Sequence, residues 1–333
     1  MSAPAIRTVL TFRASSIGDC LMGTYFLENV HAAYPDARCG IVIGSRARMI
    51  RELMRDYPWI EVIEVNRRKP RTILRLLREW RGSDLVLTQY TGKGGSFSLP
   101  SKIIARLLAR RGGLIGFTDV FWGNHFLYNT LVPFSASVAT AELERLALRA
   151  AGIPVVLPYP TLAHAAPHAG DRPYLVVHLF AGNASRGLSP AYQKELVHTL
   201  AHAFGEQYSL FLTGAAEDVE NAETAAAGTR AEVRAGKIPL YELPAFLAGA
   251  ACVVSVDTGV AHIAAQSGAK LLVLRTCLGP AWWLPGQYGE GVPLRVCTNA
   301  AHTVQDHPKG DYPSCINGIR VAEITDTLSK ILV

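Results

Sequence analysis

The segment 13–19, with the sequence RASSIGD, combines small residues with a single carboxylate. It follows a short apolar run typical of a strand and leads into a helical pattern. Gly18 and its small neighbours permit a tight turn with exposed backbone amides. Asp19 then falls in the first helical turn, where the helix dipole favours the ionised carboxylate. Such a group can take a proton from an attacking hydroxyl, although the spacing also suits an aspartate that only caps the helix.

A second strand-to-helix junction lies at 255–262, with the sequence SVDTGVAH. Asp257 or Thr258 can cap the helix, and the free amides at 258–260 form a ready site for a diphosphate. His262 follows one turn later. Its imidazole can hydrogen-bond a phosphate or sugar oxygen, or it can be a satisfied core histidine.

Two further loops follow predicted strands. The segment 181–187 (AGNASRG) places Arg186 among small residues, and a guanidinium group binds phosphate through two hydrogen bonds. The segment 212–218 (LTGAAED) carries Glu217, whose carboxylate can accept hydrogen bonds from ribose hydroxyls. The alternative for the first is an ordinary polar loop, and for the second an acidic residue at a helix N-terminus.

Several other site classes are disfavoured. The segment 91–96 (TGKGGS) lacks the G-x-x-x-x-G-K-[ST] order of a phosphate-binding loop, and no G-x-G-x-x-G follows the first strand, which argues against a dinucleotide dehydrogenase. Cys297 and Cys315 flank two histidines, but no tight C-x-x-C pair is present. We therefore expect no metal, with leaving-group charge met by amides and an arginine.

Strand-like and helix-like patterns alternate along the chain, which predicts parallel βαβ units. The predicted strands are 7–13, 39–43, 60–65, 84–88, 174–180, 209–213, 232–235, 252–256 and 270–274. The predicted helices are 19–33, 47–55, 72–80, 102–109, 191–204, 218–227, 241–247, 260–267 and 322–332. The pattern weakens at 152–173, which is rich in proline and typical of a linker.

A length of 333 residues suits two domains. We expect an N-terminal domain at 1–155, a linker at 156–173 and a C-terminal domain at 174–320. No apolar run reaches the roughly 18 residues of a membrane span, and no signal peptide is visible, so we expect a cytoplasmic protein. The six cysteines are scattered through a long chain and are expected to be reduced.

Positive charge is concentrated in the first half of the chain. Residues 1–160 hold 21 Lys and Arg against 12 Asp and Glu, whereas residues 161–333 hold 12 against 15. The densest basic stretch is 66–71, and a second group comprises Lys102, Arg106, Arg110 and Arg111. Such a face favours an anionic glycolipid or membrane surface, or is simply solvated. Nucleic acid is disfavoured because aromatic residues do not interleave the basic ones.

Taken together, these motifs resemble glycosyltransferase family 9, which includes the ADP-heptose:lipopolysaccharide heptosyltransferases. The resemblance rests on 13–22 (RASSIGDCLM), 33–37 (AYPDA), 256–262 (VDTGVAH) and the later Gly279-Pro280. It implies the GT-B fold, an α/β architecture of two facing Rossmann-like domains with mostly parallel sheets and an interdomain cleft. It also implies that the acceptor binds the first domain, that the donor binds the second, and that the reaction is inverting and metal-independent. The C-terminal helix, 321–333, is expected to pack back on the first domain.

The resemblance also implies roles for individual residues. Asp19 matches the catalytic aspartate. The implied donor contacts are Arg186, Glu217, Asp257, Thr258, Gly259, Val260 and His262, and the expected acceptor contacts are Ser16, Gly18, Arg67, Arg68 and Lys69. The chain departs from the family pattern at Tyr25, usually proline, at Arg186, usually lysine, and at Leu188, usually tryptophan.

The expected function is transfer of a sugar, most simply heptose from ADP-heptose, onto a lipopolysaccharide core or similar cell-envelope glycan. The expected partners are the nucleotide-sugar donor, an anionic glycolipid acceptor and the inner face of the membrane, where the protein would be peripheral, with no cofactor beyond the donor. Two alternatives stay open. A nucleotide-sugar epimerase would turn over the donor without an acceptor, and a non-catalytic nucleotide-sugar-binding protein would bind the donor without transfer.

Overall fold

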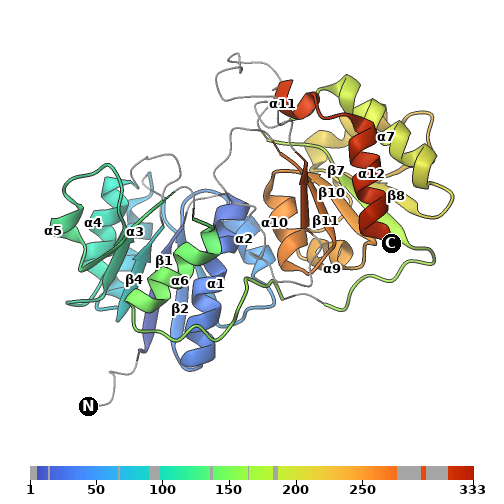
Figure 1. Cartoon of the computed structure of the whole chain (residues 1–333). Coiled ribbons are helices and arrows are strands. Elements are labelled where there is room, and N and C mark those ends of the chain that lie inside the picture. The colour runs from blue at the N-terminus through green and yellow to red at the C-terminus, as the bar shows by residue number, and fades with distance from the viewer. Residues whose placement is uncertain are drawn as a thin grey trace. The chain divides into compact units, whose positions relative to one another are not determined.

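The computed structural model describes residues 6–13, 16–66, 68–89, 98–135, 138–163, 165–182, 187–275, 294–297 and 314–333, with backbone alone at 294–297 and 314. The described residues form two compact units (Figure 1). One unit extends to Pro160 and the other begins at Thr161, so the division falls inside the predicted linker.

The first unit is built on a six-stranded parallel sheet in the order β3-β2-β1-β4-β5-β6. Its strands are β1 (Thr8–Phe12), β2 (Arg38–Ile43), β3 (Ile60–Glu64), β4 (Leu85–Thr88), β5 (Leu114–Phe117) and β6 (Thr130–Val132). The central strands β1 and β4 are almost entirely buried, as expected of a parallel sheet covered on both faces. The last two strands are short and were not among the predicted elements.

Helices cover both faces of this sheet (Figure 1). They are α1 (Ile17–Ala33), α2 (Ala47–Leu53), α3 (Pro70–Trp80), α4 (Leu99–Leu108), α5 (Asn124–Leu127) and α6 (Thr140–Ala150). Helix α1 contacts α2 and α6, whereas α4 contacts α3 and α5. Right-handed crossovers on either side of β1 place these two groups on opposite faces.

The second unit repeats this winding. Its parallel sheet has the order β12-β11-β10-β7-β8-β9. The strands are β7 (Tyr174–His178), β8 (Ser209–Leu212), β9 (Glu232–Val233), β10 (Cys252–Val256), β11 (Leu271–Leu274) and β12 (Leu294–Cys297). The pair β7–β10 occupies the central place that β1–β4 holds in the first sheet. The predicted α/β class with two Rossmann-like sheets is confirmed.

The helices of the second unit are α7 (Pro190–Phe204), the 3-10 turn η3 (Ala216–Asp218), α8 (Val219–Ala226), α9 (Leu243–Ala248), α10 (Gly259–Gln266), α11 (Ser314–Asn317) and α12 (Val321–Leu332). Helix α12 packs on α7, and an apolar stripe of Val321, Ile324, Leu328 and Ile331 joins the core of this unit. The terminal helix therefore packs on the second unit, where its apolar stripe completes the core.

Candidate active site

Both sheets have a topological switch point between their central strands. From β1 the chain turns towards β2, and from β4 it turns the opposite way, towards β5; β7 and β10 repeat the arrangement. Loops leaving such strands diverge and open a crevice at the carboxyl ends, where ligands of these folds bind. Three of the four predicted motifs follow β1, β7 and β10, and the fourth follows β8. Topology therefore places the first three beside a switch point.

Asp19 lies in the first turn of α1, directly after β1. Ser16 is the N-cap of this helix, with extended backbone, and its hydroxyl oxygen accepts from the Asp19 amide at 3.2 Å. The same hydroxyl donates to Oδ2 of the Asp19 carboxylate. No described residue donates to Oδ1, and the Asp19 side chain is only half-buried. The arrangement fixes the carboxylate through one oxygen and leaves the other for a hydroxyl of a ligand.

The start of α1 rests on a buried ion pair. Arg13, which follows β1, binds Glu144 of α6 through Nη1–Oε1 and Nη2–Oε2 contacts of 2.6 and 2.9 Å. The Arg13 guanidinium also donates to the carbonyl oxygen of Gly23 at 3.3 Å. A Cβ atom at Gly23 would lie 2.1 Å from Nε of Arg13, so only glycine leaves room for the guanidinium. This pair was not predicted as part of the site.

A hollow of about 410 Å³ opens at the carboxyl edge of the first sheet. The ends of β1, β2 and β3 line it, together with Ser101 and Ile104 of α4. Arg68, one of the predicted acceptor contacts, also lines it. Ser16, Gly18 and Lys69 do not, although Ser16 and Gly18 lie at the same edge, where α1 begins. Arg67 lies outside the described residues.

The N-terminus of α10 follows β10 in the second unit. Thr258 is its N-cap, with an extended backbone, and its hydroxyl caps no amide of the helix. Oγ1 of Thr258 is buried and has no hydrogen-bond partner. The amides of Gly259 and Val260 have no acceptor within the helix, because the first amides of any helix lack one. An unsatisfied buried hydroxyl costs roughly 1–3 kcal/mol, which an anionic ligand at this helix end would relieve.

The other predicted residues of this motif are also placed. The Asp257 amide donates to the carbonyl oxygen of Leu274 at 3.1 Å, which ties the loop to β11. His262 is buried on α10 and engaged in an interaction. Both alternatives for the histidine, ligand contact and core residue, therefore stay open.

His178, the last residue of β7, was missed by the sequence analysis. Its Nδ1 atom lies 3.1 Å from the carbonyl oxygen of Thr213, the residue after β8. Burial lowers the pKa of His178 to about 4, against an opposing effect of backbone hydrogen bonds at Thr213 and Phe180. A neutral imidazole therefore lies at the switch point. The sequence signal that could have indicated His178 is its position at the end of an apolar predicted strand.

The loops after β7 and β8 also lie at the carboxyl edge of the second sheet. Glu217 is exposed in η3, whereas Asp218 binds the Ala215 amide at 2.8 Å. Desolvation raises the pKa of Asp218, and the carboxylate of Glu217 adds to this effect. Of these two carboxylates after β8, that of Glu217 is therefore the one exposed to solvent. Arg186 lies outside the described residues.

The segment that follows Arg186 is held by α11. Asn317 accepts from the Ser189 amide at 2.7 Å and donates to the carbonyl oxygen of Gly187 at 3.3 Å. Ser189 in turn is the N-cap of α7, and its hydroxyl accepts from the Tyr192 amide. Asn317 therefore fixes the end of the loop predicted to bind phosphate, and it was not among the predicted site residues.

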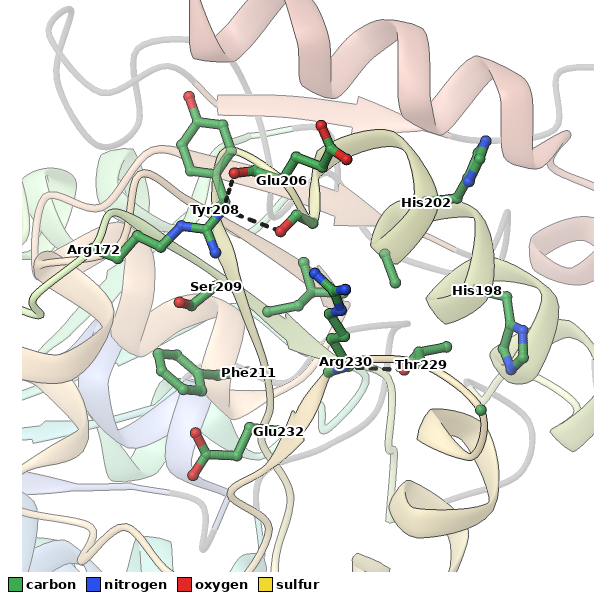
Figure 2. A pocket seen from close by; sticks show the side chains of 15 residues that line it. Arg172, His198, His202, Glu206, Tyr208, Ser209, Phe211, Thr229, Arg230 and Glu232 are labelled. Atoms are coloured by element: carbon green, nitrogen blue, oxygen red, sulfur yellow. Dashed lines mark hydrogen bonds between the residues drawn. The ribbon is translucent and has the colours of Figure 1, made fainter.

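A second hollow, of about 500 Å³, lies at the opposite edge of the second sheet (Figure 2). Ser209, the first residue of β8, lines it together with Arg172, His198 and Arg230. Arg172 donates to backbone carbonyl oxygens at the end of α7. None of the predicted site residues lines this hollow. We do not assign the donor to it, because ligands of these sheets bind at the carboxyl ends of the strands.

The described cysteine side chains are buried. Cys20, Cys39 and Cys252 are buried, and burial raises the pKa of each thiol to about 12, which keeps it protonated. Cys315 is buried on α11, whereas the side chain of Cys297 and the histidines between them lie outside the described residues. Within the described ranges, no group of three or more His, Cys, Asp or Glu side chains is placed to hold a metal ion.

One predicted member of the basic face is wrong. Lys102 is 1 % exposed, and its ammonium group binds Asp119 at 2.6 Å. It therefore contributes no charge to the surface, whereas Arg110 and Arg111 are exposed. In the part of the chain that is described, no helix has both the length and the apolar character needed to cross a bilayer.

The family model of glycosyltransferase family 9 (heptosyltransferase) matches residues 155–276. This match confirms the resemblance read from the motifs and the assignment as a glycosyltransferase. A search of curated protein sequences finds no match.

Solved structures match over nearly the whole chain. E. coli ADP-heptose lps heptosyltransferase II is 18 % identical with a TM-score of 0.71, covering 98 % of each chain. E. coli heptosyltransferase WaaC with ADP-2-deoxy-2-fluoro heptose is 21 % identical with a TM-score of 0.68, covering 96 % of this chain and 99 % of its own. The iron-containing dodecameric glycosyltransferase TibC from enterotoxigenic E. coli is 15 % identical with a TM-score of 0.58, covering 99 % of this chain and 77 % of its own. At these identities the likeness establishes the fold.

Proposed function

We propose that this chain, with its glycosyltransferase family 9 match at 155–276, transfers heptose from ADP-heptose onto a lipopolysaccharide core or similar cell-envelope glycan. The unsatisfied hydroxyl of Thr258 at the N-terminus of α10 carries the proposal, because it provides the buried polar group that a donor diphosphate would satisfy. The ADP-heptose analogue carried by a solved structure of the same fold supports the choice of donor.

The proposed reaction is a single displacement with inversion. Asp19 removes the proton from an acceptor hydroxyl, and the resulting oxygen attacks the anomeric carbon. The bond from that carbon to the diphosphate oxygen breaks, and the electron pair leaves with the nucleoside diphosphate. The amides of Gly259 and Val260, the Thr258 hydroxyl and Arg186 stabilise the charge of the leaving group. Glu217 accepts hydrogen bonds from the ribose.

The hollow at the edge of the first sheet is the proposed acceptor site. Arg68 lines it, and Arg67 and Lys69 are its neighbours in the chain. Guanidinium and ammonium groups would bind the anionic groups of a glycolipid. We propose that the protein acts at the cytoplasmic face of the inner membrane and that transfer needs no metal.

A thermal-shift panel of ADP, UDP, GDP, CDP and their sugar conjugates tests the donor assignment in the wild type and in Thr258→Val. Ligand at 100 times its dissociation constant stabilises the folded state by about 2.7 kcal/mol. We expect ADP-linked ligands to shift the wild type, and the valine variant to bind them at least about tenfold more weakly because it lacks one hydrogen bond to a charged group. If no nucleotide shifts either protein, the donor assignment is wrong.

Transfer assays with and without EDTA test the reaction. Product that forms only when donor and acceptor are both present supports transfer. Turnover of the donor alone would instead indicate the epimerase, and binding without any turnover the non-catalytic protein. Activity that EDTA removes and iron restores would contradict metal independence.

A further inference from the structure

An apolar stripe lies on the exposed side of α4 in the first unit. Leu99, Ile103 and Leu107 follow one another at four-residue spacing, which places them on one side of the helix. All three are exposed, Leu107 to 57 %. Other residues of α4, including Ala105 and Leu108, pack into the core beneath. The helix thus presents apolar residues to the core and to solvent.

Further exposed apolar side chains lie on the segment 119–126, which leads into α5, a helix in contact with α4. Trp122 is 79 % exposed and Phe126 is 81 % exposed. Their rings pack edge to face with centroids 6.2 Å apart, and Val120 beside them is exposed as well. We call these three residues together with Leu99, Ile103 and Leu107 the apolar face. Large apolar side chains gathered on a surface in this way mark an interaction site.

A buried polar network holds the aromatic segment against α4. Nζ of Lys102 donates to Asp119 at 2.6 Å and to Oδ1 of Asn124 at 2.7 Å. Asp119 also accepts from the Phe121 amide and from Asn124. Desolvation would raise the pKa of Asp119, but these hydrogen bonds outweigh it and lower the pKa. Buried charges are costly to desolvate. Here Lys102 and Asp119 anchor the segment that carries the exposed rings of Trp122 and Phe126.

Arginines accompany the apolar face. Helix α3, which contacts α4, exposes Arg71, Arg75 and Arg78. Arg106 is half-buried on α4, and Arg111 is exposed beyond its end. Glu79 pairs with Arg75 at 2.9 Å, which leaves an excess of positive charge. Apolar side chains beside several arginines are complementary to a bilayer with anionic headgroups.

We propose that the apolar face and these arginines dock the first unit on an anionic lipid bilayer. Trp122, Phe126 and the α4 stripe enter the boundary between headgroups and acyl chains, while the arginines bind lipid phosphates. The opposite side of α4 contributes Ser101 and Ile104 to the hollow of about 410 Å³. One helix then separates the bilayer from the acceptor site. The role of this contact rests on the proposed lipid-linked acceptor.

Vesicle sedimentation tests the proposal with the full chain. The vesicles are mixtures of phosphatidylglycerol and phosphatidylethanolamine, compared with phosphatidylcholine alone. We expect the wild type to bind the anionic vesicles, and Trp122→Ser/Phe126→Ser to bind them at least about tenfold more weakly, because two large apolar side chains are lost from the contact. Val155→Ser/Val156→Ser, which also removes two exposed apolar side chains from this unit, is the matched control and should bind like the wild type.

Charge is tested in the same assay. Arg106→Gln/Arg111→Gln should weaken binding to anionic vesicles, whereas Arg48→Gln/Arg55→Gln, near α2 on the other face of the sheet, should not. Brominated lipids should quench the fluorescence of the wild type more than that of Trp122→Phe. Equal binding by the wild type and the Trp122→Ser/Phe126→Ser variant would overturn the proposal.

Two further measurements separate this proposal from its alternatives. If the wild type is a dimer that Trp122→Ser/Phe126→Ser converts to a monomer, a second copy covers the face and the bilayer proposal is wrong. ADP binding and transfer to a water-soluble acceptor should be unchanged in that variant. If the variant loses vesicle binding but keeps transfer, the result supports docking. If the wild type fails to transfer sugar, the proposed function is wrong, but its binding to vesicles still supports the docking surface.

Discussion

Arg13 and Glu144 stand 131 residues apart in the chain, and their fully buried side chains meet through contacts of 2.6 and 2.9 Å. Arg13 directly follows β1, the strand that leads into the Asp19 loop, and Glu144 lies on α6. The pair therefore fixes the start of the Asp19 loop through α6, a helix far from it in the sequence. Because the guanidinium also reaches the Gly23 carbonyl, the same contact sets the position of the first turns of α1.

Removing one partner of this pair should destabilise the first unit. In Glu144→Gln the charge of Arg13 stays buried without its counterion, which costs about 3–5 kcal/mol. Calorimetry of the full chain should show a lower melting temperature for this unit. The double variant Arg13→Met/Glu144→Leu should lose less stability than Glu144→Gln, because no buried charge is left uncompensated. A Glu144→Gln protein as stable as the wild type would contradict the prediction.

Asp19→Asn should separate catalysis from helix capping. The amide keeps the shape of the side chain but cannot take a proton, so we expect kcat to fall roughly 100- to 10,000-fold. Thermal shifts with ADP should be unchanged, since the proposed donor groups belong to the second unit. Ser16→Ala provides the comparison: it keeps the carboxylate but loses the N-cap, at a cost of about 1 kcal/mol in stability. If both variants lose activity equally, Asp19 only supports the start of α1 together with Ser16.

His178 should make the stability of the second unit depend on pH. Its pKa is about 4 in the folded protein, below the ordinary 6.5, so between these values the unfolded chain binds the proton and the folded chain does not. Stability is therefore full above about pH 6.5 and falls by about 3 kcal/mol as the pH drops to 4. Urea unfolding of the wild type and of His178→Asn across this range measures the difference. Parallel pH profiles would show that the histidine is not responsible.

Asn317 should influence donor binding without contacting the donor. In Asn317→Ala both hydrogen bonds to the segment after Arg186 are lost, so we expect ADP affinity to fall about three- to tenfold with a small change in melting temperature. Asn317→Asp can still accept from the Ser189 amide but cannot donate to Gly187. Its ADP affinity should therefore lie between those of the alanine variant and the wild type. Calorimetric titration with ADP checks the order. Wild-type affinity in the alanine variant would mean that this segment does not support the donor site.

The sequence by itself determined the succession of strands and helices and the strand-end position of the site motifs. Strands buried on both faces are continuous apolar runs, and helix starts carry small and polar residues, so both signals are local. Ser16 and Asp19 illustrate this, because three residues of separation suffice to bring a cap and a carboxylate together. The resemblance of the motifs to a known family extended this reading to function.

The tertiary structure alone decided which distant residues meet. The meeting of Arg13 and Glu144 across 131 residues, the burial of Lys102 against Asp119 and the place of His178 at a switch point depend on tertiary packing and strand order. No local sequence pattern contains this information. The packing of α12 on the second core is of the same kind: its apolar stripe is readable, but the surface that it covers is not. Burial is a property of the assembled layers, so a charged or apolar side chain acquires its role only when they form.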